Sequence, residues 1–250
     1  MKTNYYEKMK EVWKIANDAL MMRPGFRDIA QGQITIEGYK EVLRQIFHHA
    51  RENPQIQSFA TAYFRGEQRK TVATFFKHAT SEIGHDQLAL DDLAALGGDV
   101  KYIPVENPLP ETTALVAYAY YQIQFRNPVG YLGYLFFLEF TPTQNGAKYL
   151  EMFKAKGVPE SALTFLEEHA TVDVSHCKLM ERYVNDLIQS DADFEEVAYA
   201  IQTTATLYGR MVEASVANAA ESTWFGISSE EARRSPKMTT TEWAKETNAR

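Results

Sequence analysis

The sequence predicts an all-α protein with a single domain. Apolar residues recur three or four positions apart along almost the whole chain, which is the spacing of one helix face. No segment alternates polar and apolar residues as a half-buried strand would, and no long linker divides the chain. The 250 residues are enough to bury one large core. We therefore expect several helices packed around a single core.

Helix-breaking residues divide this pattern into successive helices. Pro54 interrupts one helix, Gly97 follows a long one as a C-cap, and Pro128 separates two more. Pro159 suits the first turn of the next helix, after an irregular stretch with a short helical part that ends at Gly157. The expected helices are, in order, 4–22, 35–52, 55–65, 67–96, 110–125, 128–140, 159–188 and 192–222.

Composition and charge narrow the class of protein. The net charge is −7 and no run is rich in Lys or Arg, which argues against a nucleic-acid partner. No apolar stretch reaches the roughly 18 residues of a membrane span, and the N-terminus lacks the apolar part of a signal peptide. The single Cys177 excludes an internal disulfide and a Cys-based zinc cluster. We expect a cytoplasmic protein, with a helical domain over 1–225 and a polar, mobile or peripherally packed tail over 226–250.

Two stretches of eight residues carry the same arrangement of polar side chains. HATSEIGH spans 78–85 and HATVDVSH spans 169–176, and each has His, an acid four residues later and His three residues after that. On a helix these positions fall within an arc of about 60°, so each triplet shares one face. Because the neighbours on both faces are apolar or small, both triplets are predicted to face the core.

These triplets indicate a metal site. Four of the six histidines of the chain lie in the two stretches. Buried polar groups are costly unless they are paired, and imidazole and carboxylate groups suit iron, manganese or zinc. Two facing triplets that hydrogen-bond to one another are the metal-free alternative. The candidate ligands from these stretches are His78, Glu82, His85, His169, Asp173 and His176.

Glu139 and two residues near position 50 extend the candidate set. Glu139 lies in the most apolar stretch, GYLGYLFFLEF, where an ionised carboxylate needs a cation nearby; a protonated Glu bonded to a backbone carbonyl is the alternative. His48 and His49 are adjacent on a helix, so at most one of them faces the interior squarely. His48 or Glu52 is a candidate for a further ligand, or for a supporting residue, and a surface pair of the two is the alternative.

The number of candidate ligands favours two metal ions. Four His and three acids exceed what one ion needs, and they imply two metals bridged by carboxylates. Structural zinc sites are usually tetrahedral with few ligands, whereas a mixed His and carboxylate set with open positions suits Fe(II) that activates O2. We expect two Fe(II) ions, with manganese or zinc as substitutes, and O2 as co-substrate.

The order of these motifs resembles the heme-oxygenase-like diiron oxidases and oxygenases. The likeness covers about residues 10–222. It is carried by a helix with acid and His ligands, by the Gly-rich aromatic segment NPVGYLGYLFFLE with Glu139, and by the final His-x3-Asp-x2-His motif. His78 departs from the pattern, because other members have Glu near that position. The resemblance implies a bundle of about seven helices, shared with heme oxygenase, thiaminase II and pyrroloquinoline-quinone synthase.

The resemblance also implies the chemistry. Members similar to this chain use two irons and O2 in N-oxygenation of amines, oxidative C–C cleavage of amino acids, fatty-acid decarboxylation and nitrile formation. We therefore expect an O2-dependent oxidoreductase acting on a small amino acid, amine or carboxylic acid by N-oxygenation, desaturation or C–C cleavage. An inward Arg126 would favour a carboxylate substrate. The candidate substrate-pocket residues are Tyr118, Tyr121, Arg126, Tyr131 and Tyr134.

Other interpretations of the same residues stay open. A metal-free enzyme of the thiaminase II type needs a nucleophilic Cys, and Cys177 points away from the triplet face. A non-catalytic helical protein that stores metal or binds a partner is another possibility. The expected partner is a small-molecule substrate, with an electron donor and a homodimer left open, and neither nucleic acid nor a membrane. A ferritin-like four-helix site would use, in order, Glu52, Glu82, His85, Glu139, Asp173 and His176.

Overall fold

The described part of the chain is almost entirely helical. The computed structural model describes residues 4–171, 173–220, 223–224 and 227–228, and the side chains of 171–177 lie outside this description. The α-helices are α1 (Tyr5–Met21), α2 (Pro24–Ala30), α3 (Ile36–Ala50), α4 (Asn53–Ala60), α5 (Val72–Ser81), α6 (His85–Ala95), α7 (Pro110–Phe125), α8 (Tyr131–Ala155), α9 (Thr164–Thr171), α10 (Asp173–Leu187) and α11 (Asp191–Ala220). Short 3₁₀-helices span Thr61–Tyr63, Gly66–Thr71, Ile103–Val105, Pro128–Gly130 and Glu160–Ala162. Strands β1 (Thr223–Trp224) and β2 (Ile227–Ser228) pair antiparallel.

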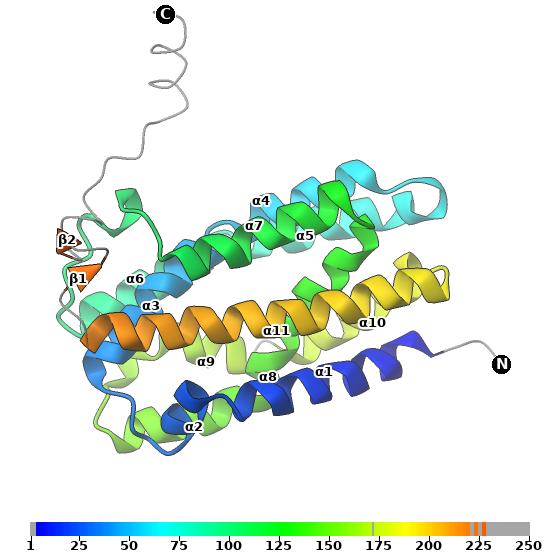
Figure 1. The fold of residues 1–250 in the computed structure, drawn as a ribbon. Coiled ribbons are helices and arrows are strands. Elements are labelled where there is room, and N and C mark those ends of the chain that lie inside the picture. The colour runs from blue at the N-terminus through cyan, green and yellow to red at the C-terminus, as the bar shows by residue number, and fades with distance from the viewer. Residues whose placement is uncertain (1–3, 172, 221–222, 225–226, 229–250) are drawn as a thin grey trace, which may run out of the picture.

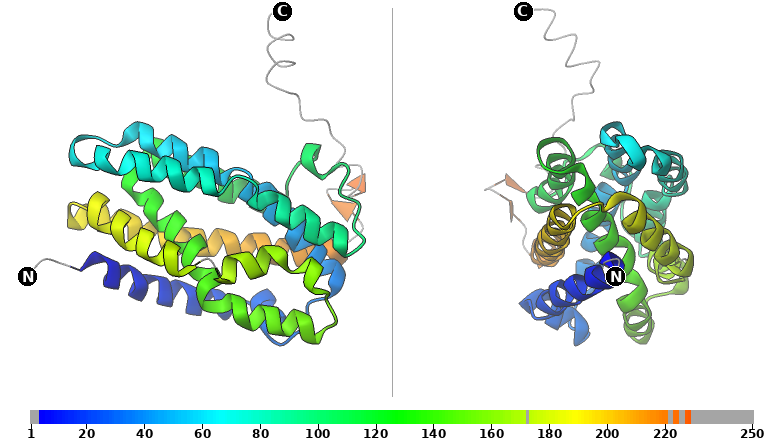
Figure 2. Two further views of the ribbon diagram at one scale, coloured as in Figure 1. Left: turned by 180° about the vertical axis from the view of Figure 1, so that it is seen from behind. Right: turned by 90° about the vertical axis from the view of Figure 1, so that its right-hand side faces the viewer.

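The helices form one elongated bundle, which confirms the expected all-α class (Figure 1). Helix α11 runs along the bundle and contacts α1, α3, α7 and α8. Helices α4, α5 and α7 lie on one side of α11, and α1 and α2 lie on the other (Figure 2). Helix α8 packs against α9 and α10, and α3 packs against α6. No helix in the described ranges is long and apolar enough to cross a membrane.

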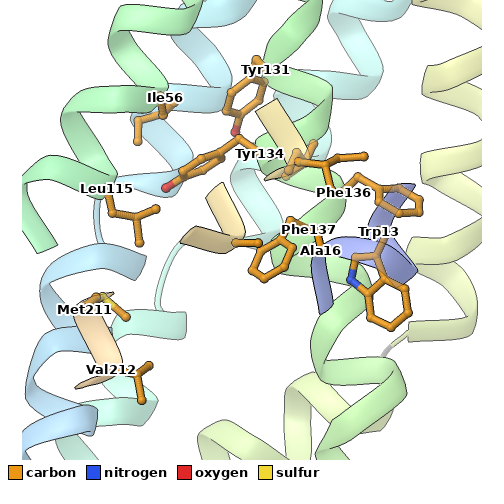
Figure 3. Packing of buried hydrophobic residues seen from close by; sticks show 14 of the residues in the cluster. Trp13, Ala16, Ile56, Leu115, Tyr131, Tyr134, Phe136, Phe137, Met211 and Val212 are labelled. Carbon is orange, nitrogen blue, oxygen red and sulfur yellow. The ribbon is translucent and has the colours of Figure 1, made fainter. Parts of the chain in front are cut away.

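Aromatic side chains fill much of the core around α1 and α8 (Figure 3). The rings of Trp13 and Phe140 meet edge to face at 4.8 Å, and Trp13 Nε1 donates to Thr141 Oγ1 at 3.0 Å. Tyr131 and Tyr134 are buried and their rings stack at 5.7 Å. Each such buried side chain contributes roughly 1.5–3 kcal/mol, so this core holds α8 firmly in place.

Helix α8 is longer than the sequence predicts. The expected end near residue 140 and the irregular stretch after it are wrong, because α8 continues through Pro142 to Ala155. Proline removes one helical hydrogen bond, and packing against α9, α10 and α11 compensates. The close approach to α11 depends on Gly133, where a Cβ would overlap the carbonyl oxygen of Val197.

The expected helix over 67–96 is divided. Helix α5 ends at Ser81 and α6 begins at His85. Between them Gly84 has φ = 100°, a conformation that residues with a Cβ rarely adopt. The apolar spacing of the sequence continues across this turn, so periodicity alone does not reveal it.

The C-terminal third also differs from the expectation. The helix expected over 159–188 corresponds to α9 and α10, and Pro159 precedes a short 3₁₀-helix instead of lying in the first turn. Strands β1 and β2 flank the expected domain boundary. Residues 229–250 lie outside the described part, so the division into a domain and a tail stays a prediction.

Candidate metal centre

The structure brings five candidate ligands together in two overlapping groups. One group consists of His78, Glu82 and Glu139, and the other of Glu82, His85 and His169. In each group one nitrogen or oxygen atom per residue lies within 4.8 Å of the others. Because Glu82 belongs to both groups, the five residues form one cluster, which we call the metal cluster.

The turn between α5 and α6 positions three of these residues. His78 lies in the last turn of α5, Glu82 caps that helix, and His85 begins α6. His78 Nε2 lies 3.6 Å from Glu82 Oε1, and His85 Nδ1 lies 3.2 Å from Glu82 Oε2. The predicted single helical face is therefore wrong for His85, because the left-handed turn at Gly84 interrupts the helix before it.

Glu139 and His169 approach from two other helices. Glu139 Oε1 of α8 lies 3.5 Å from His78 Nε2, and its side chain is only 12% exposed. His169 Nδ1 donates a hydrogen bond of 2.7 Å to the carbonyl oxygen of Phe165. This bond leaves Nε2 as the atom with a free lone pair, which is the usual way in which a metal-binding imidazole is oriented. The rings of His169 and His85 lie 4.9 Å apart.

Burial and mutual contacts set the charges in the metal cluster. Burial opposes protonation of His78, but interaction with Glu139 and Glu82 raises its pKa to about 9. Burial also opposes ionisation of Glu82, yet His78 and His85 hold its pKa well below the usual value. Burial lowers the pKa of His169. In the cluster, negatively charged carboxylates thus lie beside protonated imidazole, and a metal cation would take the place of the proton.

Among the buried atoms of the metal cluster, Glu82 Oε1 and His85 Nδ1 have no hydrogen-bond partner within the described residues. His85 Nδ1 is close enough to Glu82 for a hydrogen bond, but the contact lacks the required direction. Unpaired buried polar atoms are costly, and coordination of a cation would satisfy both. A donor set of imidazoles and carboxylates fits iron.

Asp173 and His176, the other two expected ligands, have side chains outside the described part of the chain. Their backbone belongs to α10, the helix that follows His169 along the chain. Cys177, which matters for the thiaminase-type alternative, also lies among the undescribed side chains. The roles of all three residues stay predictions.

His48 and Glu52 do not join the metal cluster. His48 Nε2 lies 3.3 Å from Glu106 Oε1, and the half-exposed Glu52 lies 3.3 Å from Arg51 Nε. Among the described residues neither of them belongs to the groups of the metal cluster, so the ferritin-like order of ligands lacks its first member there, and the supporting role stays a prediction. His49 is the member of the adjacent pair that lines the cavity beside the metal cluster. Both histidines are buried, so the expectation from the 100° offset that at most one of them faces the interior is wrong.

A cavity of about 170 Å³ lies beside the metal cluster. Most of its wall is apolar, and it comes largely from α3 and α8. Its other polar members include His49, which sequence reasoning named only as the neighbour of His48, and Asn53, which it missed. Burial lowers the pKa of His49 to about 4, so this imidazole is neutral at pH 7. Tyr134 lies behind it, with its hydroxyl 2.7 Å from His49 Nε2 and 3.4 Å from Asn53 Oδ1.

The five candidate substrate residues do not line this cavity. Arg126 lies near the surface, where it donates two hydrogen bonds to Glu196. Tyr121 is 50% exposed, and Tyr118 is partly buried on the same helix, α7. Helix α7 contributes no residue to the wall of this cavity. Tyr131 and Tyr134 are buried in α8, where they support the cavity wall from behind.

Comparison with protein families gives a match over most of the chain. A family model described as iron-containing redox enzyme matches residues 40–209. No curated protein matches the chain.

Comparison with solved structures gives the same fold. A domain of unknown function with a heme oxygenase-like fold from Shewanella denitrificans OS217 is 20% identical, covers 86% of this chain and 93% of its own, and has a TM-score of 0.75. A TenA homologue from P. horikoshii OT3 is 9% identical, covers 86% of this chain and 99% of its own, and has a TM-score of 0.70. A TenA homologue from Pseudomonas syringae pv. tomato str. DC3000 is 10% identical, covers 85% of this chain and 93% of its own, and has a TM-score of 0.68. These likenesses show a heme oxygenase-like fold.

Proposed function

The chain belongs to the family of iron-containing redox enzymes, whose model covers residues 40–209, and we propose that it is a non-heme diiron enzyme. In this proposal it uses O2 to oxidise a small amino acid, amine or carboxylic acid by N-oxygenation, desaturation or C–C cleavage. The observation that carries the proposal is that the two groups of the metal cluster share the buried carboxylate of Glu82. An electron donor, a homodimer and a cytoplasmic location remain part of the proposal.

Each ion would have its own set of three described ligands, and the carboxylate of Glu82 would belong to both sets. One ion would take Glu82, His85 and His169, and two imidazoles with one carboxylate are typical of non-heme iron sites that use O2. The second ion would take His78, Glu82 and Glu139. We propose Asp173 and His176 as additional ligands from α10, in agreement with the sequence motif.

The chain orients its ligands and keeps water away from them. Two Fe(II) ions bound here would supply two of the electrons that reduction of O2 requires, and the substrate or an electron donor would supply the others. The carbonyl of Phe165 fixes the ring of His169, and the turn at Gly84 aims His85 at Glu82. The apolar wall excludes water from the space where a substrate is held.

Reconstitution with metal tests this proposal. Metal-free protein that is loaded with Fe(II) under anaerobic conditions should bind two irons per chain, and Mn(II) should compete for the same positions. Admission of O2 should then change the optical spectrum, and a substrate should alter the decay of that change. Iron content is measured by elemental analysis.

Two histidine variants give a matched comparison. His169→Ala should lose iron, because it removes a proposed ligand. His48→Ala should retain two irons, because this buried histidine lies against Glu106 instead. The proposal fails if the wild-type protein binds no iron, or if both His169→Ala and Glu82→Ala bind the full amount.

A further inference from the structure

The cavity beside the metal cluster is a channel between α3 and α8. At one end the rings of Tyr39 and Phe153 stack at 4.1 Å. At the other end His49 meets Tyr134 at 2.7 Å, so the two helices run antiparallel along the channel. Glu139 and Phe153 are fourteen residues apart on α8, which corresponds to about 21 Å of helix. The residues of α8 that line the channel thus extend along much of the helix, and Glu139 of the metal cluster lies near one end of this lining segment.

Away from the metal cluster, no described lining residue of the channel carries a charge at neutral pH. The side chains from α2 and the neighbouring segment, including Phe26, Ile29 and Ile34, are apolar, as is Val212 of α11. No Lys or Arg is among the lining residues in the described part of the chain.

The polar side chains along the middle of the channel already have protein partners. Thr141 Oγ1 accepts from Trp13 Nε1 at 3.0 Å, and Asn145 Nδ2 donates to Asn17 Oδ1 at 2.9 Å. A second charged group of a substrate would therefore lie in the channel without a counter-ion. Burial of such a group without a counter-ion is strongly unfavourable.

We propose that the channel binds a molecule with a single polar end and an apolar chain or ring, with the polar end at the metal cluster. The inference rests on the proposed function, since it names the class of substrate for the same site. A cavity of about 170 Å³ is below the roughly 300 Å³ of pockets for drug-sized ligands, so the molecule is small. A carboxylate and an amine share this chemistry. The two are distinguished by metal: bound cations would attract the carboxylate, whereas in metal-free protein the carboxylates of Glu82 and Glu139 would attract an ammonium group.

Calorimetric binding of straight-chain probes tests the channel. Butanoate, hexanoate, octanoate and the corresponding amines are titrated into Zn(II)-loaded protein and into metal-free protein. Affinity for one of the two series should rise by roughly fourfold per methylene group, as expected for burial of CH2, until the channel is full. Octanedioate should bind at least tenfold more weakly than octanoate in the state that binds octanoate, and 1,8-diaminooctane should likewise bind more weakly than octylamine. Affinity independent of chain length in both series, or equal binding of the doubly charged probes, overturns the inference.

Two matched valine variants locate the binding. Val42 lines the channel from α3, whereas the similarly half-buried Val116 of α7 does not. Val42→Phe should lower the affinity for the longest probe that binds to the wild-type protein at least tenfold, and it should leave the zinc content unchanged. Val116→Phe should change neither. Equal effects of the two variants overturn the location. If Val42→Phe does not fold, the chain-length series on the wild-type protein still decides.

The outcomes separate this inference from the proposed function. Protein that binds no metal but shows the chain-length dependence for amines contradicts the diiron proposal and supports the channel. Protein that binds two metals but shows no chain-length dependence contradicts the channel alone.

Discussion

Two buried groups of polar residues in this bundle balance their charges in different ways. The first, which we call the α3 network, consists of Glu41, Arg44, His48 and Glu106. Arg44 lies 3.7 Å from Glu41 and 3.5 Å from Glu106, so a permanent cation stands between two carboxylates. The metal cluster has no such cation among its described members, and its cavity lining has no Lys or Arg. The comparison teaches that burial of His and acidic side chains does not by itself distinguish a candidate metal site from a structural network. The distinction lies in whether the group contains a permanent cation of its own.

The largest effect is expected from Glu82, which both groups of the metal cluster share. Glu82→Ala should lower the affinity for each ion more than a hundredfold, because loss of a supporting residue alone costs 10–100-fold. The metal content after dialysis should fall from two ions per chain to nearly none. Glu106→Ala, a change of the same kind in the α3 network, should keep both ions. Two ions in dialysed Glu82→Ala would remove the distinction between the two groups.

Removal of Glu106 is expected to affect stability instead. Glu106→Ala removes the carboxylate beside the buried His48 and leaves Arg44 with Glu41 as its remaining carboxylate partner. Breaking a buried pair in this way costs roughly 3 kcal/mol, which urea unfolding would measure. A loss below about 1 kcal/mol would indicate that solvent reaches Arg44 and that the α3 network is not a closed unit.

The α3 network should also make stability depend on pH through Glu41. Burial raises the pKa of Glu41 to about 7, although Arg44 and Gln45 oppose this. Between pH 4.5 and 7 the folded protein keeps this proton while the unfolded chain has lost it, so the free energy of unfolding falls as the pH rises. Glu41→Gln should reduce the fall between pH 5 and pH 8 by about 2 kcal/mol. The exposed Glu37→Gln is the control, and an unchanged pH profile in Glu41→Gln would contradict the prediction.

The smallest effect is expected at Arg126, which pairs with Glu196 near the surface. Arg126→Ala should cost about 0.5 kcal/mol of stability, as for other exposed ion pairs. Metal content and octanoate binding should not change, because Arg126 does not line the channel. A tenfold loss of octanoate affinity would restore Arg126 as the carboxylate anchor that the sequence suggested.

Local patterns in the sequence predicted those parts of the molecule that depend on neighbours along the chain. The 3.6-residue spacing gave the all-α class, and the repeated His and acid spacing singled out residues that the structure brings together. Glu139 was found because an ionised carboxylate in so apolar a stretch needs a cation nearby. The sequence did not distinguish His48 from His49, because the partner of His48 is Glu106, 58 residues away. The channel was missed for the same reason: it depends on how α3 and α8 pair, and each helix alone has an ordinary apolar face.

The turn at Gly84 has a consequence for mutational tolerance. A Cβ at Gly84 would meet no atom within 4 Å, and the residue is exposed, yet its φ of 100° disfavours every side chain. In a deep mutational scan, position 84 should therefore accept glycine best, asparagine and aspartate next, and β-branched residues least. Exposed positions with so narrow a tolerance are often taken for contact surfaces. Here the intolerance would come from the backbone conformation of the turn. It would measure how much the contacts of Glu82 with its two histidines depend on the geometry of the turn between α5 and α6.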